Sequence, residues 1–349
     1  MPIFDQGYQH WQGGLAGHSW RWLAVTRQGV RQQTGRRLTK WLVAAAFMPS
    51  LVLAAALVFW GLLEQQSSLL APFMFLIQAL PDEIRSGPKA YRGAVWTMAF
   101  NIFLSVETSF AMLLVLAVGP DLISQDLRFN AMPLYLSRPI RRIDYFLGKL
   151  GVIGVFLAAV AVAPAVVAYA LGVAFSMDLG VVRDTWRLLA GSVAFGLVVV
   201  LSAGTLMLAI SSLTRNSRLV GATWLGLWVV SNFAGGVLEG TVKRDWCGLV
   251  AYTSNLARAR EELIDAAPAR RKFVALAEAA MAAREQAARP AFPFGLGRNR
   301  RRPPRPSPLT ETPPYLRAPR AWSVGVLAGL FVLSAATLAT RVKSLDRLK

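Results

Sequence analysis

The chain has 349 residues, of which 54% are hydrophobic and 16% are charged, and its formal net charge at pH 7 is +19. Several apolar runs reach about 20 residues, the length needed to cross a bilayer, so the composition excludes an ordinary soluble domain and indicates a polytopic membrane protein. The single cysteine, Cys247, excludes an internal disulfide framework and a cysteine-based metal cluster.

The excess of positive charge is explained by the position of Lys and Arg at the ends of membrane spans. Much of the Lys and Arg flanks apolar runs, where anionic lipid headgroups and the positive-inside bias account for it. No motif typical of nucleic-acid binding accompanies the charge, so we expect membrane lipid, and no nucleic acid, as a partner.

Residues 1–40 form the first unit. The stretch WRWLAVTRQGVRQQTGRRL, which starts at Trp20, mixes apolar residues (Trp20, Leu23, Val30, Leu38) with arginines. It predicts a basic amphipathic helix in the headgroup region, on the cytoplasmic side. Because residues 1–40 contain no continuous apolar core, we expect no cleavable signal peptide.

The rest of the chain predicts an all-α membrane bundle. A dozen-residue apolar run, Leu69 to Leu80, is too short to cross and is interpreted as an outer interfacial segment. Pro164 predicts a kink. Residues 41–238 form a five-span core and residues 321–349 hold the last span and a basic cytoplasmic tail. The six expected spans cover 41–63, 94–119, 150–175, 188–213, 220–238 and 321–340.

Residues 239–320 form a long loop between the last two spans. Its first part, up to about Ala288, is rich in Ala, Arg and Glu at helical spacing, and the remainder is rich in Pro and Arg and predicts extended or disordered chain. With six spans and both termini in the cytoplasm, the loop is extracytoplasmic despite its excess of basic residues, since long segments translocate largely regardless of charge. The rival is an odd number of spans, with the loop inside and the C-terminus outside, which the basic tail argues against.

The insert from Gly119 to Lys149 separates the second and third expected spans. Its charged residues alternate with apolar and aromatic ones, so a short helix here would present one apolar and one ionic face. Such a segment suits the docking of a soluble partner at the membrane surface. The charged residues are Asp121, Asp126, Arg128, Arg138, Arg141, Arg142, Asp144 and Lys149.

Glu107 is an ionisable residue near the middle of the second expected span. An ionisable group at bilayer depth is costly, so it should face the bundle interior and is a candidate pathway residue. The alternative is structural: a neutral carboxyl, or one satisfied by Ser105, Thr108 or another helix, that only fixes packing.

The sequence lacks the residues that catalysis, metal binding or nucleotide binding would need. The two histidines, His10 and His18, lie in the N-terminal tail, so the chain alone offers no His-containing triad, metal site or haem ligand within the membrane. Gly148-Lys149 is not preceded by a phosphate-loop glycine or followed by Ser or Thr. We therefore expect no catalysis, cofactor or metal in this chain.

The insert also carries a family resemblance. LISQDLRFNAMPLYLSRPIRRIDYFLGKL resembles the stretch that characterises type-2 ATP-binding-cassette (ABC-2) permeases, through an "L-I-S-x-E/D" element, an "S-R-P-x-x-R-x-x-Y/F" element and "L-G-K". Asp126 stands where Glu is commoner in the family. The residues assigned to a coupling loop at 120–149 are Asp121, Asp126, Arg128, Tyr135, Ser137, Arg138, Pro139, Arg142, Tyr145, Gly148 and Lys149.

The resemblance implies the transmembrane subunit of an exporter in the plasma membrane, the inner membrane of a bacterium. Two permease copies, or a copy and a paralogue, would form the passage, and two soluble ABC ATPase subunits, which bind the ATP, would dock on the coupling helix and tilt the second and third spans. Two rivals follow from the residues. One is a secondary transporter or channel that uses Glu107; the other is a non-transporting scaffold whose basic loop binds an acidic partner.

Overall fold

The computed structural model describes residues 20–131, 141–242, 244–287 and 313–345, and within them every regular element is a helix. Six helical stretches are long and apolar enough to cross a membrane, which confirms the predicted helical bundle. They cover Arg37–Glu64, Pro88–Arg128, Arg142–Ser176, Gly180–Leu213, Ser217–Thr241 and Arg320–Arg341.

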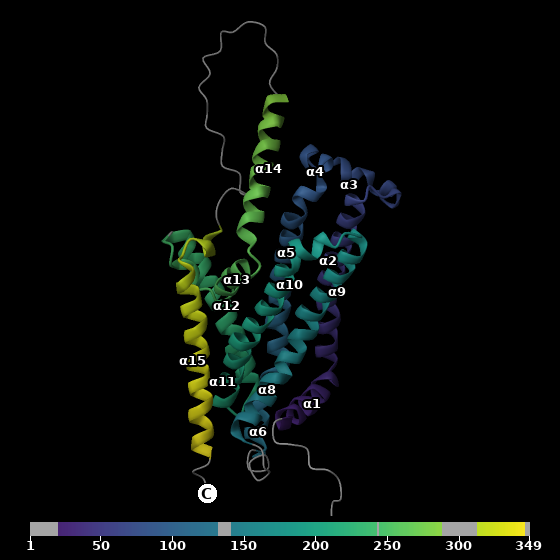
Figure 1. Cartoon of the computed structure of the whole chain (residues 1–349). Coiled ribbons are helices and arrows are strands. Elements are labelled where there is room, and N and C mark those ends of the chain that lie inside the picture. The colour runs from purple at the N-terminus through teal and green to yellow at the C-terminus, as the bar shows by residue number, and fades with distance from the viewer. Residues whose placement is uncertain (1–19, 132–140, 243, 288–312, 346–349) are drawn as a thin grey trace, which may run out of the picture.

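The spans are built from these helices: α2 (Arg37–Glu64), α5 (Pro88–Val118) continued by α6 (Asp121–Arg128), α8 (Arg142–Leu157) with α9 (Ala163–Ser176), α10 (Gly180–Val199) with α11 (Thr205–Leu213), α12 (Ser217–Thr241) and α15 (Arg320–Leu345). In Figure 1 they run side by side along one axis. The end that carries α6 is called the α6 end below, and the opposite end, which carries α13 (Tyr252–Leu263), is called the α13 end.

Several helices extend beyond the apolar runs that predicted them. The third span begins at Arg142 and not at 150: Asp144, in its first turn, accepts a hydrogen bond from the Arg141 backbone N–H at 3.1 Å, and a carboxylate there stabilises the start of a helix. Residues 176–187, which lie between the expected third and fourth spans, are also mostly helix. Met177 ends α9 with a left-handed φ of 47°, and α10 already begins at Gly180.

Two spans contain a π-helical turn, η3 (Ala158–Val162) and η4 (Val200–Gly204). The first lies directly before Pro164, which occupies the first turn of α9. A proline removes a backbone donor and its ring displaces the preceding carbonyl, so the distortion has a local cause at the residue where the sequence predicts a kink.

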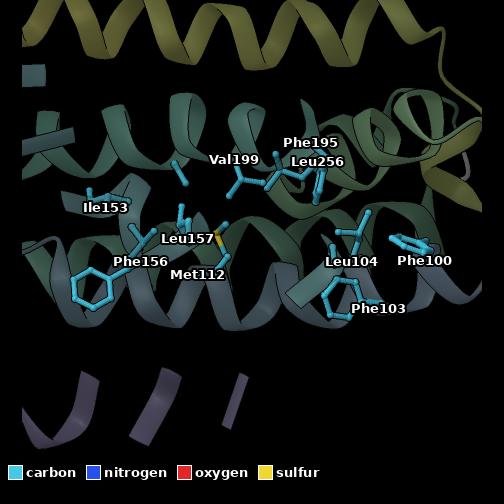
Figure 2. Packing of buried hydrophobic residues seen from close by; sticks show 14 of the residues in the cluster. Phe100, Phe103, Leu104, Met112, Ile153, Phe156, Leu157, Phe195, Val199 and Leu256 are labelled. Atoms are coloured by element: carbon cyan, nitrogen blue, oxygen red, sulfur yellow. The ribbon is translucent and has the colours of Figure 1, made fainter. Parts of the chain in front are cut away.

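Helices α5 and α10 form the centre of the bundle. More than half of the apolar window of each of these spans is buried, 56% in both, against 17% for α12 and 22% for α15, so the last two lie at the periphery. Figure 2 shows the packing: Phe100 and Met112 of α5 lie in one cluster with Phe156 of α8 and Phe195 of α10. Such burial is the main favourable term that holds the helices together where they exclude lipid and water.

Helix α1 (Arg21–Thr34) lies along the start of α8 at the α6 end (Figure 1). Glycines permit this approach: a Cβ on Gly148 would lie 2.5 Å from Val25 Cβ, and Thr26 Oγ1 donates to the Gly148 carbonyl at 3.0 Å. Trp20 and Leu23, by contrast, keep exposed side chains. That exposure is compatible with the predicted interfacial helix, whose contact with lipid stays a prediction.

The α13 end is closed by shorter elements. After α2 come η2 (Ser68–Phe73) and α3 (Met74–Gln78), which leave Leu69 and Phe75 exposed where the sequence predicts an interfacial segment, and then α4 (Asp82–Ser86). Within the long loop lie η5 (Cys247–Leu249), α13, α14 (Ala266–Ala287) and η6 (Pro314–Leu316). Most of the Pro- and Arg-rich segment, residues 288–312, lies outside the described residues.

Candidate functional site

Helix α6 forms the centre of the candidate site. It follows α5 after only Gly119 and Pro120, and it has the two faces that the sequence predicts: Leu122 and Ile123 are buried, whereas Arg128 is exposed. Gly119 packs against Met207 of α11 so closely that a Cβ would overlap the methionine side chain. The start of α6 is therefore joined to α5 and packed directly against α11.

A serine of α11 holds the start of α6. Ser211 Oγ accepts hydrogen bonds from the Ile123 and Ser124 backbone N–H groups at 3.2 and 3.0 Å and donates to the Pro120 carbonyl at 2.8 Å. Ser124 Oγ lies 2.7 Å from Ser217 Oγ at the start of α12. These bonds satisfy backbone groups at the N-terminus of α6 and fix it to the turn between α11 and α12.

Three predicted site residues meet in one cluster between α6 and α8. Tyr145 Oη donates to Asp126 Oδ2 at 2.6 Å, Lys149 Nζ lies 2.7 Å from the same oxygen, and the ammonium sits 5.4 Å from the centre of the Tyr145 ring. Tyr145 and Lys149 are only 3% and 8% exposed. The cluster thus links two helices inside the bundle and is not itself a contact surface.

A second ion pair joins α6 to the N-terminal helices. Asp121, also predicted as a site residue, pairs with Arg36, which precedes α2. Gly148 contacts α1, as described above, and Arg142 is exposed at the start of α8. The remaining predicted residues, Tyr135, Ser137, Arg138 and Pro139, lie outside the described residues.

An open groove of about 700 Å³ lies between α6 and the α11–α12 turn. Its basic groups are Arg128 from α6, Arg215 from the turn and Arg218 from the first turn of α12, and all three are exposed. No spacing in the sequence links this turn to an insert some 90 residues earlier. We call it the basic groove, lined by Asp121, Gln125, Arg128, Thr214, Arg215, Asn216, Ser217 and Arg218.

Glu107 lies in the bundle interior, as predicted, with 1% of its surface exposed. Neither carboxylate oxygen has a hydrogen-bond partner among the described residues, and Thr108 Oγ1 donates to the Leu104 carbonyl. Of the structural alternatives, a contact with the Ser105 or Thr108 hydroxyl is therefore not present in the described part of the chain, whereas a neutral carboxyl remains compatible with it.

A polar cleft of about 540 Å³ lies between α5, α12 and α13. Ser105 and Ser109 of α5, Asn232 of α12 and Arg260 of α13 line it. Arg260 Nε donates to Asn101 Oδ1 at 2.7 Å, and burial lowers the pKa of this guanidinium. No group of three or more His, Cys, Asp or Glu within the described residues is placed to hold a metal ion.

Comparison with known families decides the classification. The profile of the ABC-2 family transporter protein matches residues 33–244, more than half of the chain, from the end of α1 to beyond α12. The chain belongs to the ABC-2 transporter family. It is an integral membrane protein and the permease component of an ABC transporter, and permeases of this family normally work with an ABC ATPase. No curated protein and no solved structure gave a significant match.

The match also divides this permease into two parts. It includes α6, the start of α8 and the α11–α12 turn, so the whole basic groove lies within the ABC-2 region. It ends at residue 244, and α13, α14 and α15 follow it.

Proposed function

We propose that this permease couples ATP hydrolysis by a separate ABC ATPase to the movement of a substrate across the membrane, and that the ATPase docks in the basic groove. The observation that carries the proposal is the position of the three exposed arginines on α6 and the α11–α12 turn, which offer charge-assisted hydrogen bonds to acidic side chains. The permease has no phosphate-binding loop of its own, so ATP would be bound by the partner.

The contacts around α6 support a route for the motion. A partner that pulls on α6 acts on α5 through two intervening residues, on α8 through the Asp126–Tyr145–Lys149 cluster, and on α12 through Ser124 and Ser217. The ATPase would need to bind two states of the permease with different affinity, because only a differential interaction shifts a conformational equilibrium. The spans that lead from the groove would tilt together.

The proposal includes an orientation. The α6 end would face the cytoplasm, where a soluble ATPase is found, and both termini and the basic groove would lie on that side of the plasma membrane. The arginines at this end, Arg36, Arg128, Arg215 and Arg218 among them, agree with the positive-inside bias. The α13 end and the 239–320 loop would then be extracytoplasmic.

The polar cleft supports a second permease copy. Hydroxyl and amide groups such as those of Ser105, Ser109 and Asn232 are unfavourable against lipid and favourable at a helix–helix contact, so a second copy facing α5 and α12 would cover them. The space between the two copies would then contain the passage.

Charge reversal in the basic groove tests the proposal. In Arg215→Glu/Arg218→Glu, the ATPase should no longer co-purify with the tagged permease from native membranes, and the ATP hydrolysis of the purified fraction should fall to background. The matched control is Arg244→Glu, which reverses an exposed arginine at the α13 end and should leave the complex unchanged. A complex that survives the double reversal intact would contradict docking in the groove.

One observation favours a second candidate function, a secondary transporter or channel. It is Glu107, buried in the second span without a partner among the described residues, as expected of a group that binds a proton or cation during transport. Flux driven by a proton gradient in vesicles that contain the permease alone, lost in Glu107→Gln, would favour this function over ATP-driven transport.

A further inference from the structure

A second hollow lies on the other face of α13. It has a volume of about 500 Å³ and runs between α10, α13 and α15, next to the π-turn η4. Its walls are almost entirely apolar, and charged groups occur only at its rim. We call it the apolar groove, and its walls include Val198, Leu201, Leu263, Leu327, Ala328 and Phe331.

The apolar groove is as deep as one leaflet. Along α15 its lining extends from Arg320, the first residue of the helix, to Phe331. At 1.5 Å per residue, this distance is about 16 Å, and half of the hydrocarbon core of a bilayer is about 15 Å. The lining along α15 thus has the length of one leaflet, counted from the first residue of the last span.

The rim carries donors that suit a phosphate group. Arg258 and Arg320 lie 3.3 and 3.7 Å from the carboxylate of Glu262, longer than a direct charge-assisted hydrogen bond. Arg258 Nη1 donates to the Leu316 carbonyl at 2.8 Å, while its buried Nε has no partner among the described residues. Two guanidinium groups against one carboxylate leave a net positive charge where a lipid headgroup would lie.

We propose that the apolar groove is a binding site for one phospholipid with an anionic headgroup. An acyl chain occupies the hollow between α10 and α15, and the phosphate accepts hydrogen bonds from Arg258 and Arg320 at the rim. The lipid fills a gap that side chains leave between the last span and the bundle, and it thereby fastens α15 to α13.

Size and position distinguish this occupant from the alternatives. A helix of a second copy, about 10 Å across over the same length, needs more than about 1,000 Å³, twice the volume of the hollow. The polar cleft lies on the opposite face of α13, because Ala257 and Arg260 line the cleft whereas Arg258 and Ala259 line the groove. The site is therefore separate from the proposed passage, and the inference does not depend on the docking of an ATPase.

Native mass spectrometry of the full-length permease tests the site. The protein is purified in detergent, delipidated and titrated with phosphatidylglycerol or phosphatidylcholine. The wild type should bind one tight equivalent of phosphatidylglycerol and should bind phosphatidylcholine more weakly. Ala328→Trp fills the hollow and should abolish the tight equivalent, whereas Leu333→Trp, an exposed position on α15 outside the groove, should keep it.

The headgroup contact is tested separately by Arg320→Gln, which needs no change to the apolar walls. This variant should bind phosphatidylglycerol roughly tenfold more weakly, the effect of losing one charge-assisted hydrogen bond, and should no longer distinguish the two lipids. Arg183→Gln, an exposed arginine on α10, should retain the preference. Equal binding of both lipids by the wild type, or equal retention of lipid by Ala328→Trp and Leu333→Trp, would overturn the proposal.

Discussion

The two ends of the bundle use charge in different ways. At the α13 end, the side chains of Arg92 and Glu64 are only 5% and 1% exposed, and the guanidinium donates to both carboxylate oxygens, at 2.8 and 3.0 Å from Nε. At the α6 end, Arg128, Arg215 and Arg218 remain exposed around an open groove. The buried Arg92–Glu64 pair at the α13 end is thus satisfied inside the protein, whereas the three arginines of the basic groove at the α6 end remain accessible to a partner.

The α13 end contains a second buried network with the same property. Glu261 accepts from Asn101 at 3.2 Å, from Tyr315 Oη at 3.1 Å and from Arg270 at 2.9 Å, and Arg260 donates to Asn101. Four separate segments, α5, α13, α14 and η6, meet on one carboxylate. Stability at the α13 end and the proposed coupling at the α6 end therefore depend on separate residues, so they can be disrupted separately.

The largest effect is expected at the buried pair. Glu64→Ala removes the main partner of Arg92 and the acceptor of Trp60 Nε1, which donates to Glu64 at 2.8 Å. Removing one member of a buried pair costs about 3–5 kcal/mol, and the lower figure applies because Asp178 and Asp184 remain near Arg92. The melting temperature in detergent should fall by many degrees.

The control for this change is Arg85→Ala. Arg85 pairs with the exposed Asp82, and exposed pairs contribute about 0–1 kcal/mol, so its melting temperature should stay close to that of the wild type. Equal losses in the two variants would show that burial does not set the strength of these pairs.

An intermediate effect is expected in the cluster between α6 and α8. Tyr145→Phe keeps the ring against Lys149 and removes only the hydroxyl that donates to Asp126, a bond to a charged group worth about 1.5–3 kcal/mol. Because Tyr145 is buried away from the groove, the amount of bound ATPase should stay constant while substrate-stimulated ATP turnover falls. Loss of the ATPase itself from this variant would mean that the cluster takes part in docking.

A smaller effect is expected between α1 and α8. Gly148→Ala places a Cβ 2.5 Å from Val25 Cβ and 2.9 Å from the Trp22 carbonyl oxygen, and overpacking of this kind costs about 1–3 kcal/mol. The variant should unfold at a lower temperature. Gly154→Ala is the matched control on the same helix, since its Cβ would meet nothing closer than Val200 Cγ1 at 3.6 Å and should have little effect.

The smallest effect concerns pH at the α13 end. Hydrogen bonds from the Gly180 N–H and from Arg92 lower the pKa of Asp178. A carboxyl group whose pKa is lower in the folded protein than in the unfolded chain stabilises the fold at any pH above the unfolded-chain pKa. This stabilisation is lost as the pH falls through the lower, folded-state pKa. Melting temperatures of the wild type should therefore drop from pH 5 to pH 3 slightly more than those of Asp178→Asn. An identical acid dependence in the two proteins would show that Asp178 does not contribute to the loss of stability at low pH.

The sequence predicts the six spans because bilayer-length apolar runs need no tertiary context to be recognised. It also predicts that α6 has two faces and that Glu107 points inward. Helix ends are less predictable: Arg142 and Lys149 lie on α8 outside the apolar run, where capping by Asp144 and the pair with Asp126 keep the chain helical.

The composition of the site is only partly visible in the sequence. Asp126, Tyr145 and Lys149 were expected in a coupling loop, but their mutual contacts, which bury them, depend on the folding of α8 back onto α6. Arg215 and Arg218 join the groove only because Ser211 fixes the start of α6 to their turn. Contacts between segments some 90 residues apart carry no local signal, and no periodicity reveals them.

Cross-linking from within the basic groove shows whether an ATPase binds there in the membrane. A photoreactive amino acid is placed at Arg218, or at Arg244 as the control on the opposite end, and the membranes are irradiated with the transporter in its native complex. We predict a covalent adduct between position 218 and an ATPase subunit, identified by its peptides, and none from position 244. An ATPase adduct from position 244, with none from position 218, would contradict this prediction.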